Sequence, residues 1–284
     1  MATKKAGSAA KKTVKKSPAP SKPTTTTTKV TTVKAIETAS PVKSTRLTSN
    51  RTFIASALIA EFIGTFLLTA VVMGTRGEPL YVAFSLVAIV LTVGAISGAH
   101  VNPLLTVGAW VTRKMTTLRA LGYIVAQVLG AAFALVVLTL FIGAAPAPDA
   151  SSAMMGQAQT PELFKVAALT DKSHWYVFFA ELVGATIFAF AVANARRITE
   201  RSAQALTVGL GLLVAVLFAV TAAGYASANA IVNPAVALAI GGVADWAKID
   251  WVAFAAYFIA PLIGGVLGFA LQDVLHAGQN RKDV

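Results

Sequence analysis

Two Asn-Pro pairs lie inside apolar sequence, and each predicts that a helix begins in an unexpected place. The first, Asn102 and Pro103, stands within SGAHVNPLLTVGAW. Asn is a strong N-cap, and Pro is favoured at the first helical position, where its missing N–H needs no partner. A helix from Pro103 to Val111 would be about 13 Å long, which is roughly half of a ~30 Å bilayer core. The second pair, Asn233 and Pro234, predicts a similar half-helix.

The composition indicates a membrane protein with several spans. Hydrophobic residues make up 56% of the 284 residues and charged residues 13%, which is too apolar for an ordinary soluble domain. The net charge of +12 is concentrated in residues 1–52, which hold 12 of the 24 Lys and Arg and a single acid, Glu37. Residues 1–51 are predicted to be a disordered basic cytoplasmic tail that fixes topology. Contact with anionic lipids is the alternative role, and nucleic-acid binding is not expected.

Six apolar runs are each long enough to cross a bilayer, which takes about 20 residues. They cover residues 53–73, 80–98, 121–145, 175–195, 203–223 and 251–270. The chain also repeats, because AEFIGTF at 60–66 matches AELVGAT at 180–186 and AQVLGA at 126–131 matches APLIGG at 260–265. Each half, about 53–145 and 175–276, holds three spans and one half-helix, so the second half enters from the opposite face. The predicted fold is an all-α membrane protein with six transmembrane helices and two half-helices in an inverted repeat, followed by a short cytoplasmic tail at 277–284.

Lys and Arg near the span ends predict the orientation. On the face of the basic tail lie Arg113, Lys114, Arg119, Arg196, Arg197, Arg201, Arg281 and Lys282. On the opposite face lie Arg76, Lys165, Lys172 and Lys248. The tail face is therefore predicted to be cytoplasmic. We expect a multi-pass protein of the cell membrane with both termini in the cytoplasm and the connection 146–173 outside.

Four polar residues are interpreted as structural braces. Glu61 and Glu181 occupy matching places in the repeat, and intramembrane carboxylates are often functional, for example in proton relays. However, the return segments that precede the half-helices, 94–101 and 224–232, have N–H groups that need partners at membrane depth. We therefore expect both Glu side chains to accept hydrogen bonds from these segments. His100 and Gln127 are expected to be further braces.

These motifs together resemble the aquaporin and glycerol-facilitator family of membrane channels. The resemblance rests on SGAHVNPLLTVG, the second NPA, the paired AEF and AEL openings and the twofold repeat, and it covers about residues 52–276. It implies six tilted helices around one pore per subunit, usually in a homotetramer, with no cofactor. The implied pore centre comprises Asn102, Pro103, Leu104, Asn233, Pro234 and Ala235, with both Asn amides donating to the solute. The positive N-termini of the half-helices would repel cations but not neutral solutes.

Two positions depart from the family's usual pattern. Leu104 stands where the family usually has Ala, which places a bulkier side chain beside Pro234. Val236 stands where the family usually has the Arg of the outer selectivity filter, and Ala237 stands where glycerol channels often have Asp. Counted without gaps, the filter positions are Val82, Thr221, Ala230 and Val236. The constriction is therefore expected to be wide and apolar, with no fixed cation.

The expected function is a passive pore for water and small neutral solutes, and three alternatives stay open. One is a facilitator for glycerol, urea or ammonia with little role in water transport. Another is a secondary transporter, which would need ionisable groups in its path, where Glu61 and Glu181 are the only acidic candidates. The third is a structural or tethering protein that acts through the basic tail. An enzyme is not expected, because no nucleophile, base and orienting group can be assembled. No metal site is expected either, because three His and no Cys give no metal-ligand spacing.

Overall fold

The computed structural model describes residues 44–145, 154, 162–170, 172–242 and 249–280, and these residues form helices and connections without any strand. In chain order, the long elements of the first half are α1 (Ser44–Gly74), α2 (Pro79–Ser97), α3 (Pro103–Val111) and α4 (Thr117–Gly143). The second half contains α6 (His174–Ala195), α7 (Arg201–Gly224), α8 (Pro234–Ala239), α9 (Trp251–Phe254), the π-helix η1 (Ala255–Ile259) and α10 (Ala260–Asn280). Six stretches are long and apolar enough to cross a membrane, and α9, η1 and α10 together form the sixth.

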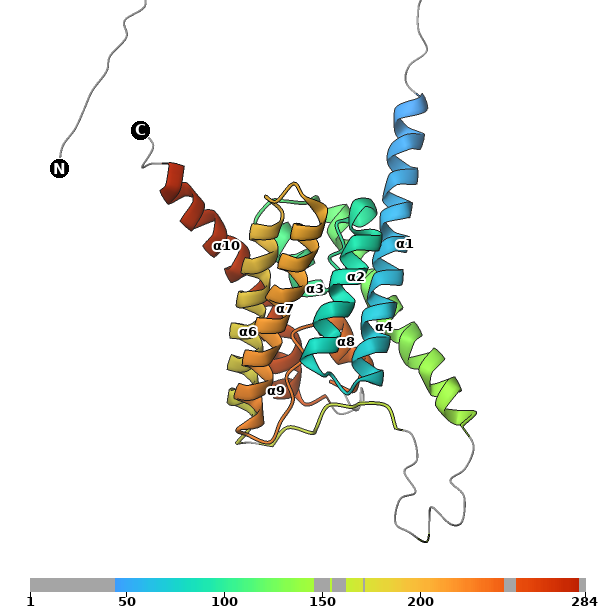
Figure 1. The fold of residues 1–284 in the computed structure, drawn as a ribbon, viewed down its shortest axis with the longest axis vertical. Coiled ribbons are helices and arrows are strands. Elements are labelled where there is room, and N and C mark those ends of the chain that lie inside the picture. Colours follow the sequence, from blue (N-terminus) through green and yellow to red (C-terminus); the bar gives the residue numbers. More distant parts are fainter. Residues whose placement is uncertain (1–43, 146–153, 155–161, 171, 243–248, 281–284) are drawn as a thin grey trace, which may run out of the picture. The chain divides into compact units, whose positions relative to one another are not determined.

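The half-helices pack across the repeat. In the first half α1 packs against α2 and α4, and in the second half α6 packs in the same way against α7 and α10. The half-helix α3 contacts α10 of the other half, and α8 contacts α4. Figure 1 shows α3 and α8 between the long helices, with the start of α1 and the end of α10 on the same side. The predicted fold, with six spans and two half-helices in an inverted repeat, is confirmed.

The helix boundaries differ most from the predicted ones at three places. α1 begins at Ser44 and α10 continues to Asn280, so both helices extend into the predicted tails 1–51 and 277–284. Neither extension contains a Pro that would end a helix. α8 is shorter than predicted because Gly241 adopts a left-handed conformation with φ of 91° just after its C-cap. The remaining residues of the two tails lie outside the described residues.

Matching glycines allow close helix contacts in both halves. Gly130 in α4 and Gly264 in α10 occupy equivalent places in the repeat. A Cβ added at Gly130 would lie 2.4 Å from the carbonyl oxygen of Phe62, and one added at Gly264 would lie 2.4 Å from that of Leu182. No real carbon–oxygen contact is so short. The pairs α1–α4 and α6–α10 therefore meet backbone to backbone, as small residues permit in membrane helices.

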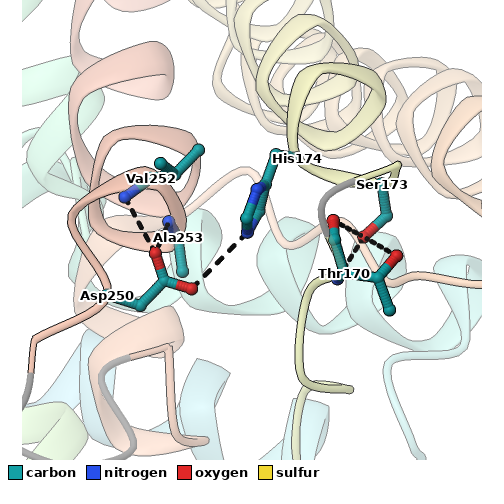
Figure 2. A network of polar contacts seen from close by, with 6 residues as sticks. All are labelled: Thr170, Ser173, His174, Asp250, Val252 and Ala253. Carbon is teal, nitrogen blue, oxygen red and sulfur yellow. Dashed lines mark hydrogen bonds and ion pairs between the residues drawn. The ribbon is translucent and has the colours of Figure 1, made fainter.

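A segment on the side opposite the start of α1 ties the two halves together. Within residues 162–170, the N–H of Phe164 donates to the carbonyl of Met73 at 3.3 Å, and the N–H of Val166 donates to the carbonyl of Ile240 at 3.0 Å. These bonds connect the end of α1 with the end of α8. On the same side, His174 Nε2 at the start of α6 lies 3.5 Å from the Asp250 carboxylate that caps α9 (Figure 2). We call this the loop side of the protein.

Candidate functional site

The two Asn N-caps reach across the repeat to each other's return segment. Asn102 Oδ1 accepts the N–H of Leu104 at 3.0 Å, while Asn102 Nδ2 donates to the carbonyl of Val232 at 2.8 Å. Asn233 mirrors this arrangement, since its Oδ1 accepts the N–H of Ala235 at 3.1 Å and its Nδ2 donates to the carbonyl of Val101 at 3.1 Å. Each amide nitrogen carries two hydrogens. One hydrogen of each Asn is used in the cross-repeat bond, and the other is available to a ligand.

The residue before each Asn is held in a strained backbone conformation. Val101 has φ of 43° and Val232 has φ of 56°, a left-handed region that β-branched residues rarely enter. Their N–H groups donate to carboxylates, Val101 to Glu61 Oε2 at 2.7 Å and Val232 to Glu181 Oε2 at 2.9 Å. Strain of this kind persists only where surrounding contacts determine it. Here the Glu side chain holds the N–H of each Val, and the opposite Asn holds its carbonyl.

The two buried carboxylates are supported unequally. Glu61 also accepts the N–H of His100 at 2.9 Å and the Gln127 side-chain amide at 2.8 Å. Gln127 in turn donates to Thr106 Oγ1, which lies 3.1 Å from His100 Nδ1. Glu181 accepts the N–H of Ile231 besides that of Val232. All four predicted braces therefore contact the return segments or each other, and Thr106 is an additional member that the sequence did not single out.

The second half lacks an equivalent of Gln127, because Pro261 occupies that place in the repeat. Pro261 has no N–H, and the backbone of the preceding turn widens into the π-helix η1, where the N–H of Ala260 bonds to the carbonyl of Ala255. This turn carries Tyr257, whose hydroxyl donates to the carbonyl of Asn229 at 3.2 Å. A tyrosine therefore supports the second return segment from the side where glutamine supports the first.

Three cavities follow one another through the middle of the described residues. The central cavity, of about 20 Å³, is lined by both Asn102 and Asn233. It shares His100 with a cavity of about 200 Å³, which we call the basic vestibule. On the other side it shares Val72 with a cavity of about 110 Å³, which we call the loop-side vestibule. A cavity needs roughly 10–15 Å³ to hold one water, so the central cavity accommodates about a single molecule at the Asn pair.

The predicted pore-centre residues are all buried beside this narrow point. Leu104 is fully buried, and its carbonyl oxygen would lie 2.2 Å from a Cβ added at Gly265 of α10. The backbone of Leu104 therefore packs directly against this glycine of the neighbouring span. Pro103, Pro234 and Ala235 are buried at the starts of α3 and α8.

Three of the four predicted filter positions line the cavities. Val82 lines both the central cavity and the loop-side vestibule, Val236 lines the central cavity, and Ala230 lines the loop-side vestibule. Thr221 lines neither cavity, whereas Val216 and Val220 of the same helix line the loop-side vestibule. One residue along a helix turns a side chain by about 100°, so Thr221 and Val220 face different directions.

The width and the charge of the passage are two further features of the structure. The central cavity holds only about 20 Å³, and bulky side chains including Leu68, Leu86 and Phe188 line it together with Val236. A fixed cation is present at the loop-side vestibule, since Arg76 in the α1–α2 turn lines it together with Glu78. The predicted apolar lining is found in the central cavity, whose polar lining residues are His100 and the two Asn.

Three cations that the sequence assigns to the face of the basic tail line one cavity, the basic vestibule, which the sequence did not predict. Lys114, Arg119 and Arg196 line it, together with Tyr123 and Gln204. Arg119 donates to the carbonyl of Ser97 at 3.1 Å and to the Tyr123 hydroxyl, which also donates to Ser97 at 2.6 Å. The spacing of Arg119 and Tyr123, four residues apart on one helix face, was the available sequence signal.

Comparisons with known proteins agree with this architecture. The sequence model of the family described as "Major intrinsic protein" matches residues 79–272. The chain is 30% identical over 221 residues to the glycerol uptake facilitator protein-like 6 of Lactiplantibacillus plantarum, covering 74% of this chain and 93% of that protein. It is 31% identical over 232 residues to aquaporin Z of Bradyrhizobium diazoefficiens, covering 74% and 88%. The solved structure of the aquaglyceroporin from Plasmodium falciparum shares the fold, with a TM-score of 0.57 at 19% identity over 78% of this chain and 96% of that chain.

Proposed function

The chain belongs to the major intrinsic protein family, and from this premise we propose that it is a passive channel whose solutes cross between Asn102 and Asn233. Its relatives are named as aquaporins and glycerol facilitators, and members of the family are channels and not enzymes. The proposed solutes are water and small neutral molecules.

The single observation that carries this proposal is the paired Asn amides at the narrowest cavity. Both Asn side chains line a space of about 20 Å³, and each has one amide hydrogen that is not used in the cross-repeat bond. A solute passing here exchanges hydrogen bonds with water for hydrogen bonds with two fixed donors. Because the other lining residues are mostly apolar, the solute oxygen is directed to the Asn pair, which gives a neutral hydrogen-bonding solute an advantage over an ion.

We propose that the selectivity filter consists of Val82, Val220, Ala230 and Val236, with Val220 in place of Thr221. These side chains offer no hydrogen-bond donor. Discrimination by these four side chains therefore depends on size, and hydrogen-bond selection depends on the Asn pair, which lines the central cavity together with Val82 and Val236. Arg76 and Glu78 at the loop-side vestibule provide one charge of each sign, so the net field at that mouth is small.

The proposed setting is the cell membrane, where the chain crosses the bilayer several times with both termini in the cytoplasm. The start of α1 and the end of α10 lie on one side (Figure 1), and the basic vestibule with Lys114 and Arg196 opens near that side. The rule that cytoplasmic segments are rich in Lys and Arg supports this orientation. We also propose a homotetramer and contact of the basic N-terminal tail with anionic lipids.

Stopped-flow measurements on proteoliposomes test the proposal. Wild-type protein is expected to raise water flux and urea flux above those of empty liposomes, with a smaller effect on glycerol because of the narrow central cavity. Water flux is expected to continue when no ion gradient is present. Accumulation of a solute against its gradient under a proton or sodium gradient would instead identify a transporter, and flux no higher than in empty liposomes would contradict a channel.

A further inference from the structure

The basic vestibule has an excess of positive charge that its own residues do not neutralise. Three cations line its volume of about 200 Å³, and no carboxylate of the described residues lines it. Lys114 pairs with Asp273 of α10. Arg119 donates to Ser97 and Tyr123, neither of which is negatively charged at neutral pH. The vestibule therefore carries the charges of Arg119 and Arg196 without a matching acid.

Arg196 is the cation with the fewest partners. Its guanidinium makes no hydrogen bond and no ion pair with the described residues, and it lies over the ring of Phe269, whose centroid is 6.0 Å from Arg196 Cζ. Partial burial and the neighbouring charge of Arg119 lower the pKa of Arg196. A cation at the end of α6 is favoured by the helix dipole, but this does not explain why three cations from separate elements surround one cavity.

Both the charge and the geometry suit an oxyanion. A guanidinium presents its N–H donors as a planar fork that matches the oxygens of phosphate or carboxylate, and Lys adds a flexible point charge. An anion between Arg119 and Arg196 would replace their mutual repulsion with attraction to both. Gln204 also lines the vestibule and adds a polar side chain. His100 at the far end of the vestibule also lines the central cavity, so an anion held here lies on the solute path.

We propose that the basic vestibule binds a small dissolved oxyanion of the phosphate type, with Arg196 as its main ligand and Arg119 and Lys114 as supporting charges. The bound anion partly obstructs the pathway and lowers solute flux. The effect on flux rests on the proposed channel function, whereas binding of the anion does not.

Equilibrium dialysis of radiolabelled inorganic phosphate against the purified full-length protein tests the binding directly. We expect saturable binding by the wild type. The variant Arg196→Gln is expected to bind phosphate about tenfold to a hundredfold more weakly, because it loses hydrogen bonds to a charged group. Arg196→Lys, which keeps the charge, should recover part of the affinity. The matched control is Arg197→Gln, the adjacent arginine, which does not line the vestibule and should bind as the wild type does.

A second variant changes the affinity in the opposite direction. Asp273→Asn removes the carboxylate that pairs with Lys114, so the freed ammonium should strengthen phosphate binding severalfold. A simple loss of folding cannot produce tighter binding. The inference is overturned if the wild type does not bind phosphate, or if Arg196→Gln and Arg197→Gln bind it equally. Release of bound phosphate by phosphatidylglycerol liposomes, but not by phosphatidylcholine liposomes, would assign the site to a lipid headgroup. That result would overturn the proposal that the ligand is a dissolved anion.

Flux measurements separate this inference from the channel proposal. In phosphatidylcholine proteoliposomes, phosphate should slow water flux through the wild type and have less effect on Arg196→Gln. Phosphate binding without any change in water flux would overturn the proposal that the bound anion obstructs the pathway. A wild type that binds phosphate but conducts neither water nor urea would contradict the channel function and leave the binding site supported.

Discussion

The centre of the molecule is held by reciprocal bonds between single residues. The N–H of Val101 and the N–H of Val232 each donate to a Glu carboxylate. The carbonyl of each Val accepts a hydrogen bond from the Asn of the other half of the repeat. Each half of the repeat therefore completes the other. A substitution at either Asn affects both return segments, because it removes a helix cap from its own half and a carbonyl partner from the other half.

Asn102→Ala is predicted to reduce both stability and flux. The lost cap alone should lower the free energy of unfolding by about 0.5–2 kcal/mol, and the carbonyl of Val232 loses its partner in a buried place. Thermal unfolding in detergent and stopped-flow water flux measure the two effects. Asn233→Ala should behave alike because its bonds mirror those of Asn102. Unchanged flux from both variants, with the folded state intact, would exclude the Asn pair from the pathway.

Val236→Arg is predicted to narrow the pathway. Val236 is 1% exposed and lines the central cavity of about 20 Å³, so a side chain with several more heavy atoms must occupy that space or the loop-side vestibule. Urea flux should fall more than water flux, as measured in the same proteoliposomes. The control is Thr221→Arg, which adds the same side chain at a position that lines neither cavity. If the control changes the urea-to-water ratio and Val236→Arg does not, the filter assignment is wrong.

For single residues, the sequence predicted hydrogen-bond partners better than it predicted the direction in which a side chain points. Glu61 and Glu181 could be interpreted as acceptors because the return segments had N–H groups that needed partners. The sequence could not show whether Thr221 or its neighbour Val220 faces the pathway, because one residue of helix changes which face a side chain occupies. Arg76 was missed because its place beside the loop-side vestibule depends on the left-handed turn between α1 and α2, where its φ is 55°.

At the scale of elements, the two halves match in order but differ in detail. The Asn-Pro signals fixed where α3 and α8 begin, and the start of each half-helix agrees with the prediction. The end of α8 depended on Gly241 and Gly242, whose backbone conformation the apolar pattern did not reveal. The π-helix η1 follows from Pro261, yet its consequence, a Tyr257 bond to the second return segment, required the three-dimensional arrangement.

Two helices begin with acidic caps, which predicts sensitivity to acid. Backbone N–H groups of Ala253 and Val252 lower the pKa of Asp250, and those of Ala203 and Ser202 lower the pKa of Glu200. A depressed carboxyl pKa contributes stability that is present above the unfolded-state value and is lost as pH falls through the folded-state value. Thermal stability should therefore decline below about pH 4, near the ordinary Asp and Glu values.

The variant Asp250→Asn tests this explanation. Asn caps a helix about as well as Asp but does not titrate, so the melting temperature at neutral pH should change little while its decline in acid becomes smaller. His174, which lies 3.5 Å from the Asp250 carboxylate (Figure 2), is unchanged in this variant. A decline in acid as steep as that of the wild type would show that other groups cause it.

At the scale of the whole molecule, the inverted repeat was predictable because sequence matches, span number and half-helix positions all agreed. The assembly of the basic vestibule was not. Its cations come from the turn after α3, the start of α4 and the residue that follows α6, and only the packing of those helix ends brings them together. The connection that residues 162–170 make between the two halves was likewise not predictable, since it depends on backbone hydrogen bonds to the ends of α1 and α8.

Deletion of residues 1–43 is predicted to leave the pore working. Residues 44–280 contain both Asn residues, the four braces (Glu61, Glu181, His100 and Gln127) and the lining of all three cavities. The hydrogen bonds at the Asn pair should therefore form without the tail. Water flux per protein molecule should stay within about twofold of the full chain, measured in phosphatidylcholine liposomes.

Comparing the full chain with the variant that lacks residues 1–43 also distinguishes a channel from a protein that acts as a tether. In liposomes with anionic lipid, the full chain should bind more strongly at its tail than the deletion variant, because each Lys or Arg near such a surface adds about 1 kcal/mol at low salt. Orientation after refolding should become less uniform when the tail is removed, as judged by protease access to the Lys-rich face. Loss of flux from a folded deletion variant would mean that the tail belongs to the channel. Flux retained in the variant, with altered lipid binding and orientation, assigns conduction to the repeat and topology to the tail.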